Sequence, residues 1–131
     1  MTNLRFDMTT LLVPDYDAGI AFYRDALGFT LVEDADLGGD KRWVIVAPGD
    51  GGRLLLAKAV SEHQALAIGN QTGGRVGFFL ETDDFHATYA QFTTNGVTFH
   101  EEPRHEAYGT VAVFSDPFGN RWDLIEHKKA A

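Results

Sequence analysis

Hydrophobic residues in the first half of the chain follow two spacings, one typical of strands and the other typical of helices. Residues 4–13 are densely apolar and stop at Pro14, whose fixed φ and missing N–H end a strand. Apolar residues then recur at roughly helical spacing over 20–27, after Asp15 or Asp17, either of which can cap a helix. The pattern predicts a strand and then a helix.

Three more strands are predicted after Gly28, a residue typical of a helix C-terminus. They are rich in β-branched or aliphatic residues and cover 29–33, 42–47 and 53–58. The acidic, glycine-containing segment 34–41 is predicted to be a turn or mobile connection, and 48–52 a hairpin turn. The first half therefore reads βαβββ.

The second half repeats this order after a short helix predicted at 62–68 and a glycine-rich connector. Asp83 or Asp84 can cap the second long helix, which ends at Asn95 and Gly96. The strands expected in this half are 75–82, 97–100, 110–115 and 121–126, with a polar loop at 101–109 and a turn at 116–120.

Unlike landmarks in the two halves keep a nearly constant separation, so an internal βαβββ repeat is more economical than chance similarity. The separation is 68 residues from Asp15 to Asp83, 68 from Gly28 to Gly96 and 69 from Pro48 to Pro117. We expect an α+β fold in a single domain, residues 1–131, made of module 4–60 and module 74–127 joined by the linker 61–73.

The composition and net charge of the chain exclude several classes of function and partner. With 44% hydrophobic and 23% charged residues, the 131-residue chain resembles an ordinary soluble globular domain. A net charge of -8 repels nucleic-acid phosphates and anionic lipids but attracts a cationic small molecule. The lack of cysteine excludes thiolate nucleophiles and iron–sulfur clusters. With no signal segment and no apolar run of about 18 residues, we expect a cytoplasmic protein with no nucleic-acid or membrane partner.

The repeat carries short motifs that together resemble the vicinal-oxygen-chelate superfamily, the group of glyoxalase I, extradiol dioxygenases, and fosfomycin- and bleomycin-resistance proteins. The resemblance covers about residues 6–127. The matching residues are Val13, Asp15, Phe22, Tyr23, Leu27, Gly28 and Phe29 in the first half, and Asp116, Pro117, Phe118, Gly119 and Asn120 in the second.

The resemblance implies two βαβββ modules that form curved mixed sheets around a cavity, with the helices on the outer faces. Many members pair, so a homodimer is expected, and the cavity can lie within one chain or between two. Metal-dependent members place one ligand on the first strand and one on the last strand of each module. Such a site holds a cation with N and O ligands and leaves positions open for substrate oxygens.

Most of those ligands are missing here. Counting from the motifs places Met8 and Gly77, or Val76 with a slip of one residue, at the first-strand positions. The last strand of the first module offers only Leu54–Leu56, and Asp123 alone keeps an oxygen donor. We therefore expect no metal and no cofactor.

Strand alternation and the resemblance together select the residues that line the cavity. We expect Trp122 and Leu124 to pack on the helix side instead. The expected ligand-binding residues are Met8, Thr10, Leu12, Arg42, Gly77, Phe79, Tyr108 and Asp123, and the candidates for catalysis are Asp123, His105 and Tyr108.

Asp123 has two possible roles. A carboxylate on a central strand must pair with a cation, take up a proton, or face a solvent-filled cavity. A salt bridge to Arg121, Arg75 or Arg42 would make it structural, whereas an open cavity would make it a ligand anchor or general base. The loop before the strand at 110–115 adds titratable groups, among them His105 and Arg104.

Three functions remain open. The first is a protein similar to the bleomycin-resistance proteins, which binds a small molecule in a metal-free cavity. The negative net charge of the chain favours a cationic molecule. The second is a lyase, isomerase or dioxygenase of the same superfamily that uses acid–base residues or an atypical metal site. The third is a structural or regulatory module with no ligand. The sequence does not decide whether the protein is an enzyme.

Overall fold

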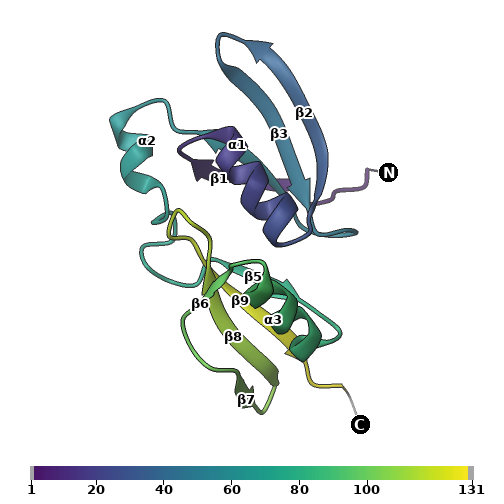
Figure 1. Ribbon diagram of the computed structural model, residues 1–131. Coiled ribbons are helices and arrows are strands. Elements are labelled where there is room, and N and C mark those ends of the chain that lie inside the picture. Colours follow the sequence, from purple (N-terminus) through teal and green to yellow (C-terminus); the bar gives the residue numbers. More distant parts are fainter. Residues whose placement is uncertain (1, 130–131) are drawn as a thin grey trace. The chain divides into compact units, whose positions relative to one another are not determined.

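The computed structural model describes residues 2–129. The chain divides into two compact units, residues 1–65 and 66–131, and each contains one open sheet and one main helix (Figure 1). This confirms the predicted α+β fold. The boundary lies inside the predicted linker 61–73, and the interpretation of the two units as one domain stays a prediction.

The first unit has the order βαβββ, with a mixed sheet of strand order β1-β4-β3-β2. Strands β1 and β4 are parallel, and the other neighbours are antiparallel. The elements are β1 (Met8–Val13), α1 (Tyr16–Ile20) continued by the π-helix η1 (Ala21–Ala26), β2 (Thr30–Gly38), β3 (Lys41–Ala47) and β4 (Arg53–Lys58). The short α2 (Glu62–Ala67) follows and contains the boundary between the two units.

Close packing of α1 on one face of this sheet forms the core of the first unit. A Cβ atom on Gly19 would lie 3.0 Å from Leu56 and 3.2 Å from Val13, so glycine lets the helix approach the strands. Leu11 and Val13 are fully buried on this face, whereas Thr10, which precedes them in β1, is exposed and Leu12 between them is half-buried. The opposite face, called the open face below, is not covered by α1.

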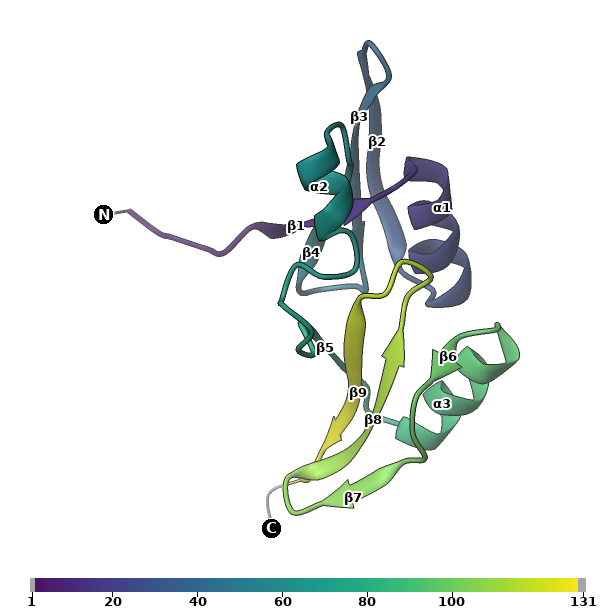
Figure 2. The ribbon, with the colours of Figure 1, turned by 90° about the vertical axis from the view of Figure 1, so that its left-hand side faces the viewer.

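The second unit repeats this arrangement with strand order β5-β9-β8-β6 and an additional strand, β7, on β8. Figure 2 shows the helix of each unit on one side of its own sheet. The elements are β5 (Phe78–Glu81), α3 (Phe85–Thr94), β6 (Thr98–Phe99), β7 (Arg104–Glu106), β8 (Gly109–Ser115) and β9 (Arg121–His127). Phe92, Phe114 and Trp122 build its aromatic core, with ring centroids 5.6 and 5.9 Å apart.

Both helices begin at the predicted aspartates. Asp15 accepts a hydrogen bond from the Asp17 amide, and Asp84 accepts one from the Ala87 amide at 3.1 Å. The Glu126 carboxylate on β9 adds a bond from the Phe85 amide at 2.7 Å. The sheet thus supplies part of the cap of α3, which the local sequence alone did not indicate.

Two connections were predicted wrongly. Segment 34–41 is mostly strand, because β2 continues to Gly38 and turns at Gly39 and Asp40. Its acidic composition suits an edge strand exposed to water. Segment 101–109 contains β7, which pairs with β8, so long-range pairing gives order to what its composition marks as a loop.

No helix within residues 2–129 is both long and apolar enough to cross a membrane.

Candidate functional site

The open faces of the two sheets carry most of the predicted site residues. In the first sheet, Met8, Thr10 and Leu12 alternate with the buried Leu11 and Val13 and therefore lie on the open face. This placement agrees with the predicted alternation.

In the second sheet, one row of side chains crosses the open face from β5 through β9 to β8. Phe79 lies opposite Asp123, and Asp123 lies opposite Val113. Trp122 and Leu124 are buried on the helix side, as expected. Phe79 is 66% exposed, which is unusual for a phenylalanine at the centre of such a row.

Matching registers identify equivalent positions in the two sheets. Met8 lies opposite Arg53, and the Gly77 amide donates to the Arg121 carbonyl at 3.0 Å. Arg53 and Arg121 are separated by the same 68 residues as the landmarks of the repeat. Met8 and Gly77 are therefore equivalent, as the motif count predicted.

The metal positions implied by the family do not fit a cation. Met8 and Gly77 supply no hard donor, and Leu55 stands at the place that Asp123 holds in the other sheet. A Cβ atom on Gly77 would lie 2.5 Å from the Thr72 methyl carbon, so Thr72 fills the space of a side chain there. Within residues 2–129, no three His, Asp or Glu side chains are grouped as metal ligands.

Asp123 has an unusual environment. Its Oδ1 atom is buried and has no hydrogen-bond partner among residues 2–129. Burial raises the pKa of the Asp123 carboxyl, the Arg104 charge opposes this shift, and the Glu101 charge adds to it. Burying a hydrogen-bond acceptor without a donor costs free energy. The Oδ1 atom is therefore suited to accept a hydrogen bond from a bound molecule.

None of the arginines proposed as structural partners pairs with Asp123. Arg42 instead donates to Asp17 at 2.8 Å and to Asp34 at 2.7 Å. These two carboxylates raise the pKa of Arg42. Arg42 also lies 5.3 Å from the Tyr16 ring centre, next to α1 and away from the open face of its sheet.

Arg104 is held by carboxylates of its own loop. It donates to Glu101 at 2.8 Å and to Glu106 at 2.9 Å. The second oxygen of Glu101 accepts from the Val113 amide at 2.9 Å, which attaches the loop to β8. The sequence analysis named Arg104 among the titratable groups of this loop. The role of Glu101 beside Asp123 was not foreseen, because it depends on strand pairing.

Of the two other catalytic candidates, His105 does not lie with Asp123. His105 pairs across β7 and β8 with Thr110, and Thr110 lies opposite Glu126. Glu126 caps α3, so this row is on the helix side of the sheet, and Asp123 is on the open face. Tyr108 is 53% exposed in the turn before β8. The structure therefore does not bring His105 and Asp123 together as an acid–base pair.

Known proteins share the family and the fold of this chain. The model of the glyoxalase/bleomycin resistance protein/dioxygenase superfamily matches residues 5–124. An uncharacterized protein of Shewanella frigidimarina (strain NCIMB 400) is 49% identical over 88% of both chains.

Solved structures of binding proteins are also similar. The antibiotic-binding protein TnmS3 from Streptomyces sp. CB03234 is 28% identical, with a TM-score of 0.78 over 98% of this chain and 99% of its own. A bleomycin-binding protein complexed with bleomycin is 25% identical, with a TM-score of 0.66 over 95% of this chain and 100% of its own. The chain belongs to the glyoxalase/bleomycin resistance protein/dioxygenase superfamily.

Proposed function

We propose that the protein binds a small organic molecule with a cationic group on the open face of the second sheet, without a metal. The observation that carries this proposal is the buried, unpartnered Oδ1 atom of Asp123. An ammonium or amidinium group of a ligand would supply the missing donor and favour the charged carboxylate.

The surroundings of Asp123 support a ligand that joins a cation to an apolar or aromatic body. The exposed Phe79 ring lies directly across the strand pair from Asp123. Sites for small molecules commonly combine apolar walls with a few fixed polar groups. The net charge of -8 also favours the approach of a cation.

The relatives support binding as the activity. TnmS3 is an antibiotic-binding protein, and another similar structure is complexed with bleomycin. The alternative of a lyase, isomerase or dioxygenase needs either a metal set or an acid–base pair. The donors at the metal positions do not fit a cation, and His105 lies on the opposite face of the sheet from Asp123.

Strand alternation and the family resemblance are the grounds on which we propose further ligand contacts. Met8, Thr10 and Leu12 lie on the open face of the first sheet, and Gly77 stands at the equivalent place in the second. Tyr108 is accessible in its turn. A cytoplasmic homodimer is the assembly that we propose.

Titration with bleomycin and with ethidium, an aromatic cation, tests the proposal through tryptophan fluorescence and calorimetry. Loss of one charge-assisted contact is worth about 1.5–3 kcal/mol, so Asp123→Asn should weaken binding by at least about tenfold. Phe79→Ala should weaken it as well. Asp83→Asn removes an exposed carboxylate in the same unit and serves as the matched control. Equal affinities for Asp123→Asn and the control would refute the role of Asp123.

A further inference from the structure

The open face of the second sheet carries two charges of opposite sign along β9. Arg121 and Asp123 both lie on this face, because Trp122 between them is buried on the helix side. A strand rises by about 3.3 Å per residue, so the Cα atoms of the two charged residues are about 7 Å apart. A ligand anchored at Asp123 therefore has Arg121 within reach of its other end.

The Arg121 guanidinium is available to a bound molecule. The residue is exposed and forms no ion pair within residues 2–129. The Oδ1 atom of Asp123 has no hydrogen-bond partner there either. The two opposite charges thus share one face of the sheet without pairing with each other.

The internal repeat shows what an arginine at this place does when a carboxylate is near. Arg53 is the equivalent of Arg121 in the first sheet, and it pairs with Asp7 at 3.6 Å. Asp7 directly precedes β1, and the equivalent place before Gly77 holds Val76. The second unit therefore lacks the carboxylate that holds the equivalent arginine in the first.

Polar groups on β8 and the preceding loop stand beside Arg121. Ser115 lies directly opposite Arg121 across the strand pair, a position in which Cβ atoms are about 5 Å apart. The Ser115 hydroxyl oxygen is 2.8 Å from the Nε2 atom of the exposed His100. When Nε2 donates its hydrogen to this oxygen, the hydroxyl hydrogen is free to be donated to an anion.

The charges around the two places differ in sign. Beside Asp123, the Arg104 guanidinium is shared by two carboxylates of its own loop, so this end of the site is negative. At the other end, Asp116 in the adjacent turn directs both of its oxygens at donors of the turn itself. Arg121 therefore supplies a positive charge that no side chain of the described residues pairs with.

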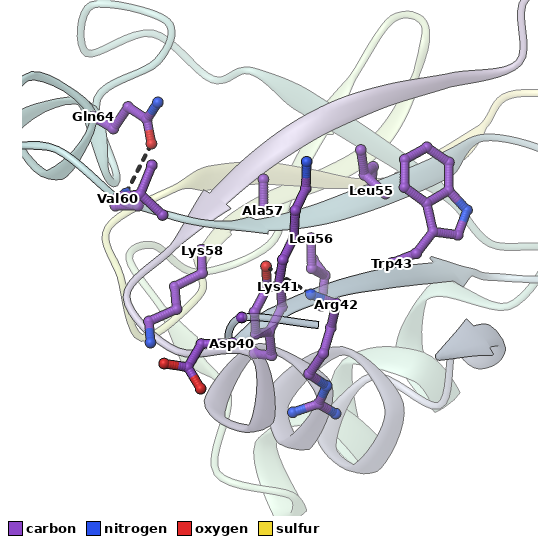
Figure 3. Close-up of a pocket in the computed structure, with 13 residues that line it drawn as sticks. Asp40, Lys41, Arg42, Trp43, Leu55, Leu56, Ala57, Lys58, Val60 and Gln64 are labelled. Carbon is purple, nitrogen blue, oxygen red and sulfur yellow. Dashed lines mark hydrogen bonds between the residues drawn. The ribbon is translucent and has the colours of Figure 1, made fainter. Parts of the chain in front are cut away.

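The equivalent places of the first sheet lack this arrangement. Leu55 stands where the second sheet has Asp123, and Figure 3 shows its side chain on the same side of the strands as Trp43. The equivalent arginine, Arg53, is already paired. The combination of an unpaired cation and an unpaired carboxylate at these places thus belongs to the second sheet.

We propose that the ligand of this site is an aromatic zwitterion, which joins a protonated amine to a carboxylate across about the length of a dipeptide. The amine would pair with Asp123, the carboxylate with Arg121 and Ser115, and the ring would pack on Phe79. The inference rests on the proposed function and deepens it. It adds an anionic group to the cationic ligand and assigns Arg121 as the residue that selects for that group.

The test compares tryptophylglycine, which has a free amine and a free carboxylate, with its amide, which keeps the amine and the ring but has no negative charge. Calorimetry and nuclear magnetic resonance titration measure both affinities, and a melting curve checks each variant. Arg121→Gln should lower the affinity for the dipeptide about fivefold relative to the amide, the upper range for an exposed ion pair. Asp123→Asn should weaken both ligands to the same degree.

The matched control is Lys128→Gln, which removes the same charge from an exposed position just beyond the far end of β9. It should leave the ratio of the two affinities unchanged. An unchanged ratio in Arg121→Gln, an equal change in the control, or no saturable binding of the dipeptide would overturn the inference.

Failure of the inference is distinguishable from failure of the proposed function. If the amide and ethidium still bind in a manner that depends on Asp123, the proposed function stands while the role of Arg121 is refuted. If neither the amide nor ethidium depends on Asp123, the proposed function itself is wrong, and the inference is refuted with it.

Discussion

Asp116 lies in the turn between β8 and β9, and Asp123 lies on β9, but the two carboxylates differ in their partners. Asp116 is 4% exposed, and its Oδ1 atom accepts from the Phe118 and Asn120 amides at 3.0 and 2.9 Å. Its Oδ2 atom accepts from the Asn120 side chain at 2.7 Å. Asp116 therefore organises the turn of the DPFGN motif, whereas the Oδ1 atom of Asp123 is left for a ligand.

Asp116→Ala should destabilise the protein by about 3 kcal/mol, because it leaves buried donors in the turn without an acceptor. Urea unfolding followed by circular dichroism measures this change. Asp50→Ala, at an exposed turn position, is the control and should change stability by less than about 0.5 kcal/mol. A loss for Asp116→Ala as small as that of the control would contradict this role.

Asp123→Asn should stabilise the unliganded protein at pH 7, raising the melting temperature by about 2–4 °C. Burial raises the pKa of Asp123, so the folded protein binds this proton more tightly than the unfolded chain. The charged carboxylate therefore costs stability above the raised pKa, and the cost disappears as the pH falls below the ordinary value of 3.8.

Melting curves of both proteins between pH 7 and pH 3 measure this dependence. The advantage of Asp123→Asn should shrink steadily as the pH is lowered. An advantage that is independent of pH would mean that the charge of Asp123 is not its cause.

At the scale of elements, the connector between the units packs against the turn that Asp116 organises. Gly69 has a φ of +72°, and an added Cβ atom would overlap the Phe118 carbonyl oxygen. Both features require glycine, the first because other residues rarely adopt this backbone region and the second because backbone cannot move aside cheaply. The glycine-rich composition of the connector thus reflects close packing as well as flexibility.

Gly69→Ala should destabilise the protein by about 2–4 kcal/mol through backbone strain and the clash with Phe118. Thermal and urea unfolding of the variant measure the loss. Gly51→Ala provides the control, because Gly51 has no atom within 4 Å of an added Cβ and its φ is not positive. If both alanine variants retained the stability of the parent protein, close packing at Gly69 would be disproved.

At the scale of the whole molecule, each sheet has one face that its main helix does not cover, and each sheet has free edges. Leu4, Phe6 and Phe79 are 94%, 83% and 66% exposed, and exposed apolar groups together with unpaired edges favour association. We expect a homodimer with two-fold symmetry. Light scattering at micromolar concentration measures the mass directly. A monomer whose melting temperature does not change on dilution would rule this out.

The protein purified without chelator should contain divalent metal only in substoichiometric amounts. Met8, Leu55 and Gly77 supply no hard donor at the family's metal positions, and one carboxylate does not hold a cation firmly. Elemental analysis by mass spectrometry checks this, with Asp123→Ala as the comparison. One equivalent of nickel, zinc, manganese or iron per chain, lost in Asp123→Ala, would show that other ligands had been overlooked.

The sequence by itself determined the order of elements and the family. Pro14, Gly28 and Gly96 mark ends of elements, and Asp15 and Asp84 cap helices through bonds to residues two or three positions away. These signals act within a few residues, so they can be identified before the chain is folded. The nearly constant separation between landmarks of the two halves indicated the repeat. The ligand residues that this chain lacks could be counted directly in the sequence.

The tertiary structure alone decided which of these residues share a face and which polar groups find partners. Segment 34–41 became a strand because β3 offered a neighbour, and His105 was separated from Asp123 by the register of β7 on β8. The pairing of Arg42 with Asp17 and Asp34 spans up to 25 positions, and Ser115 lies opposite Arg121 only through the register of β8 on β9. Such features depend on contacts between distant segments, whose geometry is set only when the whole sheet packs against its helix.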